Sequence, residues 1–381
     1  MPSPYYINLG TVQTKYEVKM MSYLLAFSIT INFLFILKSI AARIGLVDKP
    51  NHRKIHQNQT PLIGGLAMFG GFIFTLLMIE QTPSGLRYLM SGAIILIIIG
   101  FLDDLYELSH HYRFAVEIIA ALLICLGGGT MLNDLGAIGF NDQVIELGVF
   151  AIPLTVFAII GVINALNMSD GIDGLAGSLT LVTLLALVIL TGNANLTQAL
   201  KLLGLLIAVT SAFLAFNLRV PGRAQAQVFM GDTGSMFLGF ILAWFMINLS
   251  QGESRVMTPV TALWIFALPL IDTVSIMLRR IFTKRSPFSA DRGHFHHLLL
   301  SAGFSVSQTL TIMIGVATTL AIIGLIGFYL KVPETVMFWG FICLFVLHFS
   351  GTMYAHKNHH FLGCSMFKQA LVENRTPEKL F

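Results

Sequence analysis

Long apolar segments recur along almost the whole chain, and they limit the possible folds more than any other feature of the sequence. A helix needs roughly 20 mainly apolar residues to cross a bilayer. Segments of this kind lie near residues 21–43, 62–80, 87–102, 114–132, 146–166, 174–191, 198–217, 234–250, 259–280, 307–330 and 334–353. We therefore predict an all-α fold, a polytopic transmembrane helical bundle of about 11 spans.

The composition agrees with a membrane protein. Hydrophobic residues make up 55% of the chain and charged residues 11%, whereas a soluble domain carries about 25% charged residues. The first twenty residues are polar and lack the short apolar core of a signal peptide. We expect a polar N-terminal segment (1–20), an integral membrane domain (21–353) and a C-terminal tail (354–381).

Lys and Arg residues accumulate on one side of the predicted bundle. Cytoplasmic loops of membrane proteins carry an excess of these residues. If the N-terminus lies outside, the inner loops are 44–61, 103–113, 167–173, 218–233 and 281–306, together with the tail. These loops and the adjoining helix ends hold sixteen of the 23 Lys and Arg, the outer side holds six, and Lys38 lies within a span. We therefore predict a periplasmic N-terminus and a cytoplasmic C-terminus.

Many acidic residues fall on this same inner side. A carboxylate without a counterion at the edge of the hydrocarbon is costly. Several acids in separate loops on one face therefore predict a shared polar site that a cation completes. The acids in question are Asp48, Asp103, Asp104, Glu107, Asp170, Asp173, Asp232 and Asp291.

Two adjacent carboxylates, Asp103 and Asp104, directly follow the apolar run 94–102, and Arg113 comes ten residues after Asp103. Such a pair can bind a metal ion, or one carboxylate can act as a base while the other orients it. A solvated loop that marks the membrane boundary is the alternative interpretation.

Four polar residues recur at every third position in the segment 164–175, which reads NALNMSDGIDGL. Asn164, Asn167, Asp170 and Asp173 would share one stripe on a helix or a tight turn. A capping turn explains one of them, but four in register predict a polar cavity, because a broken backbone between apolar spans is tolerated where it lines one.

Asp232 lies between two glycines in the segment 228–235, VFMGDTGS, at the expected start of a helix. Its carboxylate could cap that helix. Alternatively, it could hold Mg²⁺ beside phosphate oxygens, because hard oxygen ligands suit this ion. The sequence leaves both interpretations open.

Three histidines, His294, His296 and His297, end the inner segment 286–297, SPFSADRGHFHH. Their spacing is not that of a zinc site, and no Cys lies nearby. Together with Arg292 they are better suited to donate to a diphosphate or a sugar, since Arg offers phosphate a two-pronged fork. A positive-inside anchor would explain the preceding basic residues but not the histidines. Another basic inner loop carries Lys54.

Taken in order, these motifs resemble the polyprenyl-phosphate N-acetylhexosamine-1-phosphate transferase family over residues from about 45 to 305. The matching text includes GLVDKPN at 45–51, DD at 103–104 and the three segments described above. The muramyl-pentapeptide branch is less similar. It carries Lys where this chain has Glu107, and it carries three consecutive histidines where this chain has the spaced His294, His296 and His297. Some relatives have Lys at the position of Arg113.

The resemblance implies the transfer of N-acetylglucosamine 1-phosphate from UDP-N-acetylglucosamine to undecaprenyl phosphate, with release of UMP, at the cytoplasmic face of the bacterial inner membrane. It implies the first membrane step of O-antigen lipopolysaccharide or enterobacterial common antigen synthesis. It also implies eleven spans, in agreement with the charge count, and often a homodimer. Mg²⁺ is the implied cofactor, with Mn²⁺ as an alternative.

The resemblance also implies roles for residues. Asp103 and Asp104 would be catalytic, and Asp232 and Asn167 would bind the metal ion. The implied substrate-binding residues are Lys54, Arg113, Asp170, Asp173, Arg292, His294, His296 and His297. Two alternatives remain: another UDP-N-acetylhexosamine as donor, or an ion-coupled transporter. The acids at span ends rather than mid-span, and the lack of an inverted repeat, disfavour the transporter.

Overall fold

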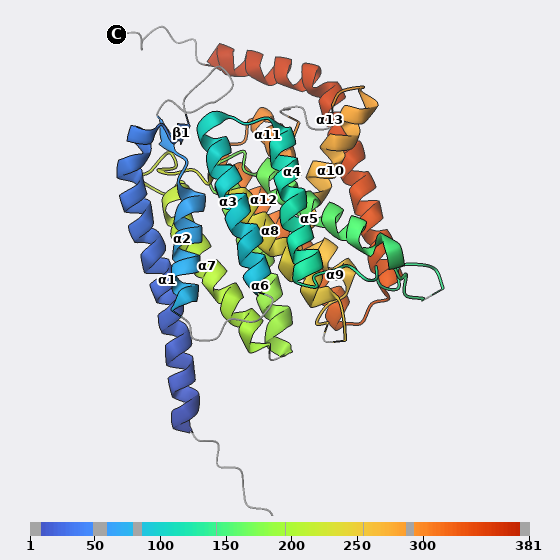
Figure 1. The fold of residues 1–381 in the computed structure, drawn as a ribbon. Coiled ribbons are helices and arrows are strands. Elements are labelled where there is room, and N and C mark those ends of the chain that lie inside the picture. Colours follow the sequence, from blue (N-terminus) through green and yellow to red (C-terminus); the bar gives the residue numbers. More distant parts are fainter. Residues whose placement is uncertain are drawn as a thin grey trace, which may run out of the picture.

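The computed structural model describes residues 9–48, 59–78, 86–141, 143–194, 196–253, 255–286 and 293–373, with side chains between residues 20 and 355. Long helices run roughly side by side and form one bundle (Figure 1). The prediction of a polytopic helical membrane protein is therefore confirmed.

Each of the eleven apolar segments forms a helix or a pair of helices. Nine helices in the described ranges are long and apolar enough to cross a membrane. They are α1 (Leu9–Ile44), α3 (Leu86–Tyr106), α4 (His110–Leu122, extended by the π-helix Leu123–Gly127), α5 (Ala151–Ser169, preceded by the 3-10 turn Gly148–Phe150), α6 (Leu175–Asn193), α7 (Thr197–Asn217), α8 (Gly231–Ser250), α12 (Val306–Tyr329) and α13 (Glu334–Glu373).

The other two segments differ from simple spans. Helix α2 (Gly64–Leu77) has 14 residues, fewer than the roughly 20 that a straight span needs. Helices α9 (Pro259–Ile265) and α10 (Ala267–Phe282) are bent by 84° at their junction, so they form a broken span or a re-entrant segment. The count of eleven spans and the orientation of the termini stay predictions.

Helix boundaries depart from the expected segments at both ends of the chain. Helix α1 begins at Leu9, inside the segment expected to be a polar N-terminal extension, and α13 continues to Glu373, inside the expected tail. Amphipathic or polar residues can continue a helix beyond the apolar core of a span, and hydropathy alone does not mark that end.

Helix α8 forms the centre of the bundle. Its residues are buried along almost its whole length, whereas few residues of α1 and α13 are buried, as expected of helices that face lipid. Glycines let two neighbours approach its first turn. A Cβ atom on Gly100 of α3 would lie 2.6 Å from Cα of Thr233, and one on Gly65 of α2 would collide with the backbone of Gly234.

A short antiparallel ladder fixes the start of α2 beside the start of α8. Strand β1 (Val47–Asp48) pairs with β2 (Thr60–Pro61). The next residue, Leu62, forms a bridge with Phe229, and the amide of Gly64 donates to the Phe229 carbonyl over 2.9 Å. Three segments distant in sequence therefore meet immediately before Asp232.

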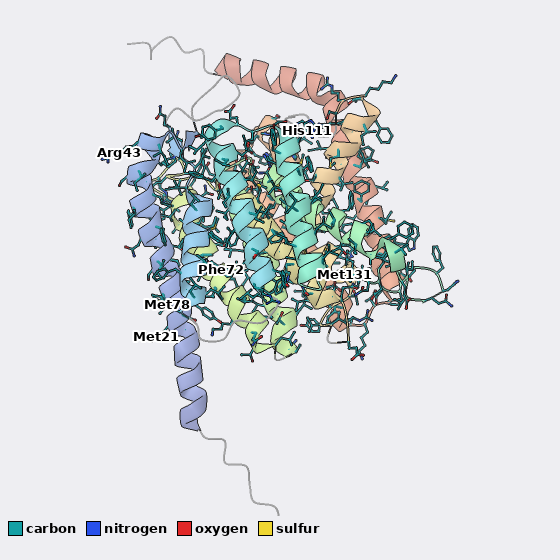
Figure 2. All side chains as sticks on the ribbon, viewed as in Figure 1. Met21, Arg43, Phe72, Met78, His111 and Met131 are labelled. Carbon is teal, nitrogen blue, oxygen red and sulfur yellow. The ribbon has the colours of Figure 1, made fainter. Side chains whose placement is uncertain are left out.

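The described parts of the predicted inner loops lie together at one end of the bundle, beside β1 and the short helix α11 (Phe295–Ser301) (Figure 1). We call this the β1 end. The loop that joins α4 to α5 and the start of α9 lie at the opposite, far end. Figure 2 shows that side chains fill the space between the helices.

Candidate active site

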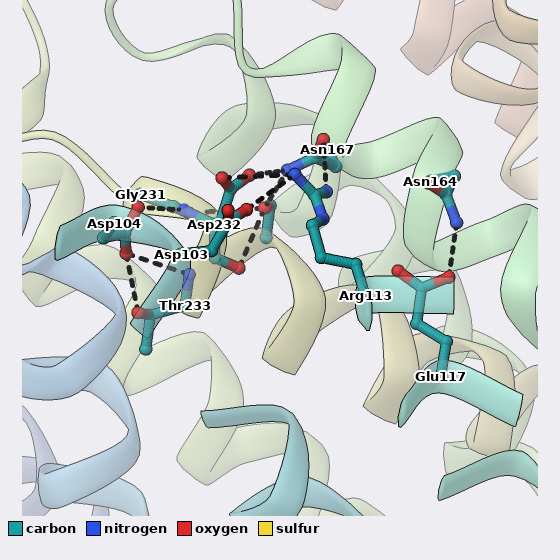
Figure 3. Close-up of polar contacts among 10 residues, drawn as sticks. Asp103, Asp104, Arg113, Glu117, Asn164, Asn167, Gly231, Asp232 and Thr233 are labelled. Carbon is teal, nitrogen blue, oxygen red and sulfur yellow. Dashed lines mark hydrogen bonds and ion pairs between the residues drawn. The ribbon is translucent and has the colours of Figure 1, made fainter. Parts of the chain in front are cut away.

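The carboxylate of Asp104 caps the N-terminus of α8. The first amides of a helix lack partners within the helix. Asp104 Oδ1 accepts from the Asp232 amide over 2.8 Å, and Oδ2 accepts from the Thr233 amide over 3.2 Å and the Thr233 hydroxyl over 2.7 Å (Figure 3). Gly231 has a φ of +72°, and a Cβ atom there would lie 2.6 Å from Asp104 Oδ2. This glycine therefore lets the capping carboxylate approach.

Asp232 lies in the first turn of α8 and does not cap it, because Asp104 does. The Asp232 side chain instead lies beside Arg113, with Oδ2 3.2 Å from Arg113 Nη1. The Asn167 side-chain amide donates to the other oxygen of Asp232 and, over 2.8 Å, to Ser235 Oγ. Helix α5 thus holds the acid of α8 in one orientation.

Asp103 contacts the same guanidinium from α3. Arg113 Nη1 donates to Asp103 Oδ2 over 3.0 Å, and Nη2 donates to Asn167 Oδ1 over 3.0 Å. Asp103 is 5% exposed, and Arg113 is 17% exposed. We call Asp103, Asp104, Arg113, Asn167 and Asp232 the carboxylate cluster (Figure 3). It joins helices α3, α4, α5 and α8 at the β1 end.

Negative charge is in excess in this cluster, because it contains three carboxylates and one guanidinium. The excess also affects the nearby turn between α5 and α6. Burial, followed by the negative charges of Asp232, Asp104 and Asp173, raises the pKa of Asp170 to about 7. A site with this charge attracts a further cation.

The predicted polar stripe of the segment 164–175 exists only in part. Asn164 and Asn167 project from α5, but that helix ends at Ser169 and the chain turns at Asp170. Asp173 points to another partner set, since its Oδ2 accepts from Arg219 Nε over 2.7 Å and from the Ala226 amide over 3.0 Å. The prediction of a stripe is wrong for Asp173, because the helix ends four residues before it.

Glu117 is a buried acid that sequence reasoning missed. It lies on α4, four residues after Arg113, and is 1% exposed. Asn164 Nδ2 donates to Glu117 Oε2 over 2.7 Å and to the Ile160 carbonyl over 2.9 Å (Figure 3). Asn164 therefore holds Glu117 rather than a site ligand. The signal was present, because an acid within an apolar span is unusual.

The histidine motif lies on the other side of the α5–α6 turn. The ring of His296 is 1% exposed, and neither of its nitrogens has a hydrogen-bond partner within the described residues. A Cβ atom on Gly171 would collide with this ring. Burial, followed by the positive charges of His297 and His294, lowers the pKa of His296 to about 3. His296 is therefore neutral near pH 7 and packs against the turn.

His294 differs from His296 in its partner. Its Nδ1 lies 2.9 Å from Oδ2 of Asp272, a residue of α10 that the sequence analysis did not single out. The two rings of His294 and His296 stack with centroids 5.5 Å apart and an interplanar angle of 13°. His297 lies beside His296, with ring centroids 4.2 Å apart.

Two predicted residues lie outside the described residues. Lys54 belongs to the stretch 49–58, and Arg292 belongs to the stretch 287–292. Their predicted contacts with substrate stay predictions.

The carboxylate cluster fits a hard cation. Within the described residues, no group of three or more His, Cys, Asp or Glu side chains converges as a complete metal site. Mg²⁺ is typically bound through one or two carboxylates, with waters and substrate phosphates as the other ligands. Asp103 and Asp232 both contact Nη1 of Arg113, so their oxygens lie within reach of a single cation.

Comparisons with known proteins agree on one group of relatives. A family model described as glycosyl transferase family 4 matches residues 86–250, a stretch that contains the whole carboxylate cluster. The chain is 38% identical over 344 residues to the undecaprenyl-phosphate alpha-N-acetylglucosaminyl 1-phosphate transferase of Yersinia pestis, an alignment that covers 90% of this chain and 92% of the relative.

Proteins of the same name from two other bacteria are similarly related. The Escherichia coli (strain K12) protein is 38% identical over 324 residues, covering 84% of this chain and 88% of its own length. The Pasteurella multocida protein is 41% identical over 317 residues, covering 83% and 88%.

Proposed function

The chain belongs to glycosyl transferase family 4, and we propose that it transfers N-acetylglucosamine 1-phosphate from UDP-N-acetylglucosamine to undecaprenyl phosphate, releasing UMP. The names and the long alignments of its relatives support both substrates. The structural observation that carries the proposal is the carboxylate cluster, in which Asp103 and Asp232 share one guanidinium at the β1 end.

The two reacting groups are both anionic, so the barrier depends mainly on positioning and on neutralising charge. We propose that Asp232 binds Mg²⁺, or Mn²⁺ in its place, and that Asn167 orients Asp232. When bound, the ion neutralises the diphosphate of the donor. The amide oxygen of Asn167 accepts from Arg113, and it becomes available as a second ligand when the guanidinium turns to a phosphate.

The two members of the Asp103–Asp104 pair have different roles in this proposal. All the contacts of Asp104 described above are with donors in the first turn of α8, so its oxygens are occupied by the helix. Asp103 faces the long side chain of Arg113, which can move away. Asp103 therefore deprotonates or positions the acceptor phosphate.

The reaction then forms one bond and breaks another. An oxygen of the acceptor phosphate attacks the β-phosphorus of the donor. The bond between that phosphorus and the bridging oxygen breaks, and UMP leaves with the bridging oxygen. Arg113 holds phosphate charge during this step, because its guanidinium is always protonated and can contact two oxygens at once.

The sugar phosphate and the nucleoside occupy the space beside the α5–α6 turn in this proposal. His294 and His297, with Arg292 and Lys54, contact phosphate or sugar. His296 is buried and neutral, so it shapes the site. Asp170 faces the nucleoside or the outer shell of the cation. Asp173 is held by Arg219 and the Ala226 amide, so it fixes the loop before α8.

The protein is a multi-pass membrane protein. We propose that it resides in the bacterial inner membrane, because its relatives are bacterial proteins. We also propose that the β1 end faces the cytoplasm, because the predicted inner loops carry the excess of Lys and Arg. The product then serves as the first lipid-linked intermediate of O-antigen or enterobacterial common antigen synthesis. A homodimer remains part of the expectation.

Release of UMP tests the proposal directly. Purified protein in detergent is given Mg²⁺, undecaprenyl phosphate and a panel of UDP-sugars. UMP from UDP-N-acetylglucosamine, its loss with EDTA and its recovery with Mg²⁺ or Mn²⁺ are the expected results. Asp232→Asn removes the proposed ligand charge and lowers turnover by about 10²- to 10³-fold.

Three other outcomes are informative. UMP from a different UDP-N-acetylhexosamine alone would keep the reaction and change the donor. Full activity of Asp232→Asn would contradict the assignment of the metal ligand. No UMP from any donor, with protein that is folded, would contradict the transferase.

A further inference from the structure

Asp272 is a buried acid that the proposed reaction does not use. It lies on α10, one residue after Ile271, and is 4% exposed beside the apolar cluster that includes Leu268 and Trp264. A carboxylate buried in a membrane protein is costly unless other groups compensate its charge. Its partners therefore indicate why the residue is present.

Donors from two other segments surround this carboxylate. His294 Nδ1 lies 2.9 Å from Oδ2, and the Phe295 amide donates to Oδ1 over 2.9 Å. His348, on α13, places Nε2 3.5 Å from Oδ1, a distance long for a hydrogen bond. The ring of Phe295 packs edge-on against the ring of His348, with centroids 5.5 Å apart. Helices α10, α11 and α13 thus meet at one side chain.

This geometry determines the proton position on His294. An ionised carboxylate accepts hydrogen bonds and donates none. Nδ1 of His294 must therefore carry a proton, and Nε2 is the ring atom left for a ligand. The partner on one nitrogen sets the tautomer and the orientation of the ring. Because the adjacent Phe295 amide binds the same carboxylate, Asp272 fixes both the ring and the main chain at this point.

Contacts connect His294 to the carboxylate cluster. Its ring stacks on His296, which packs against Gly171. Asp170 precedes that glycine and is affected by the negative charge of Asp232. His294 therefore lies across the α5–α6 turn from the cluster, with the neutral ring of His296 between them.

We propose that Asp272 is a positioning residue for the transfer: it holds His294 with a proton on Nδ1 and with Nε2 presented to the phosphate of the sugar donor, while His348 supports Asp272 from α13. This inference rests on the proposed function. It adds a buried acid on α10 and a histidine on α13 to the machinery of the reaction.

Replacement of Asp272 by Asn tests the proposal with little change in shape. An amide accepts at one atom and donates at the other. If its oxygen keeps the Phe295 amide, its NH₂ group faces His294 Nδ1, and the proton of the ring moves to Nε2. We expect Asp272→Asn to lower kcat by about 10- to 100-fold, with the KM for undecaprenyl phosphate unchanged. His348→Gln is expected to lower kcat less than about 10-fold, because its contact is longer.

A double variant separates positioning from a structural role. If Asp272 acts through His294, Asp272→Asn has no further effect on kcat in a His294→Asn background, and the two losses do not add. A purely structural role predicts that the losses multiply. Multiplied losses, or full activity of Asp272→Asn, would overturn the proposal.

Glu334→Gln serves as the matched control. Glu334 also lies on α13 and accepts a backbone amide, that of Ala137 over 3.2 Å, but it belongs to the far end of the bundle. Its replacement is expected to leave kcat unchanged.

A spectroscopic measurement does not depend on activity. Nitrogen NMR of histidine-labelled wild-type protein reports which ring nitrogen of His294 is protonated, with assignment by His294→Asn. A proton on Nδ1 is expected. A neutral ring protonated only on Nε2 would contradict this inference, even if UMP release confirms the transferase. The expected tautomer without UMP release would leave the geometry intact and contradict the proposed reaction.

Discussion

The two ends of the bundle both carry buried polar side chains, but they use them in different ways. At the far end, Gln251 accepts from the amides of Asn133 and Asp134 over 2.8 and 3.1 Å. Its own amide donates to the Asp134 carbonyl over 3.0 Å. Both polar atoms of this side chain therefore form hydrogen bonds with the main chain, and they hold the loop between α4 and α5 against the end of α8.

The other far-end contacts follow the same pattern. Glu334 accepts from the Ala137 amide, and Thr335 Oγ1 lies 2.9 Å and 2.7 Å from the carbonyls of Ala137 and Gly139. The ion pair between Arg255 and Asp134 at this end is long, at 3.8 Å. Side chains that bind main-chain groups of a loop stabilise that loop.

In the carboxylate cluster at the β1 end, side chains mainly bind other side chains, and the charge is not balanced. Asp103, Asp232 and Asn167 all contact Arg113. Such contacts can be exchanged for those of a substrate without unfolding a loop. The partner of a buried polar group, more than its residue type, therefore indicates whether the group belongs to a site or stabilises a loop. Asp104, which binds the main chain of α8, is the exception within the cluster.

The largest effect is expected when Asp103 and Asp104 are exchanged separately. Asp103→Asn removes the acid that faces Arg113 and lowers kcat by about 10²- to 10⁴-fold, the usual range for a lost acid–base group, with little change in thermal stability. Asp104→Asn replaces one of two accepting oxygens by an NH₂ group, which weakens the cap of α8 and lowers stability by about 1 kcal/mol. UMP release and thermal denaturation in detergent measure the two effects. Equal losses of activity with equal stability would show that the pair is not divided in this way.

Exchange of the shared cation is expected to have a smaller effect. Arg113→Lys keeps the charge but loses the fork that contacts Asp103, Asp232 and Asn167 together. Lysine is a point charge, so we expect kcat to fall roughly 10- to 100-fold. Arg255→Lys at the far end is the matched control and should leave kcat unchanged. An Arg113→Lys variant with wild-type kcat would show that the fork is not needed.

Much of the fold could be predicted, because apolar segments of span length and basic loops follow directly from the cost of burying polar groups in lipid. The same reasoning predicted that Asp103, Asn167 and Asp232 lie on one face of the bundle, and the structure places them within one cluster. The sequence could not reveal that Asp104 caps a helix that begins 127 residues later, because capping across helices depends on packing.

The missed residues have a common physical reason. Glu117, Asp272 and His348 are single polar residues within apolar segments, without a motif around them. Their partners are distant in sequence: Asn164 lies 47 residues from Glu117, and His294 lies 22 residues from Asp272. A search for the partner of every acid within a predicted span would have singled out Glu117 and Asp272, but not His348.

At the far end, loss of a side chain that stabilises a loop should lower the stability of the protein and leave its activity unchanged. Gln251→Ala removes an acceptor for two amides and a donor to one carbonyl. Leaving buried main-chain groups unpaired costs about 1–3 kcal/mol, so the denaturation temperature should fall while kcat stays unchanged. Asn248→Ala is the milder control, because Asn248 mainly binds a carbonyl of its own helix. A lower kcat for Gln251→Ala at a temperature where it is folded would show that the two ends are coupled.

The smallest expected effect is a pH dependence of stability at the β1 end. The pKa of His296 is about 3 in the folded protein and 6.5 in the unfolded chain. As pH falls through 6.5, the unfolded chain binds the proton first, so stability is full above 6.5 and decreases toward pH 3. Between pH 7 and 5.5 the loss amounts to about 1 kcal/mol. Asp170 has the opposite sign, since its raised pKa favours the folded state as pH falls.

His296→Gln isolates the contribution of the histidine, because glutamine does not titrate. Denaturation temperatures of wild type and variant are compared at pH 7 and 5.5 in the same detergent. We expect the wild type to lose more stability than His296→Gln over this interval, whatever their difference at pH 7. The far-end variant Gln251→Ala should keep the pH dependence of the wild type, since its change lies away from the histidine motif. Equal pH dependence of wild type and His296→Gln would show that His296 accepts a proton in the folded protein, and the β1 end would then be less closely packed than its burial indicates.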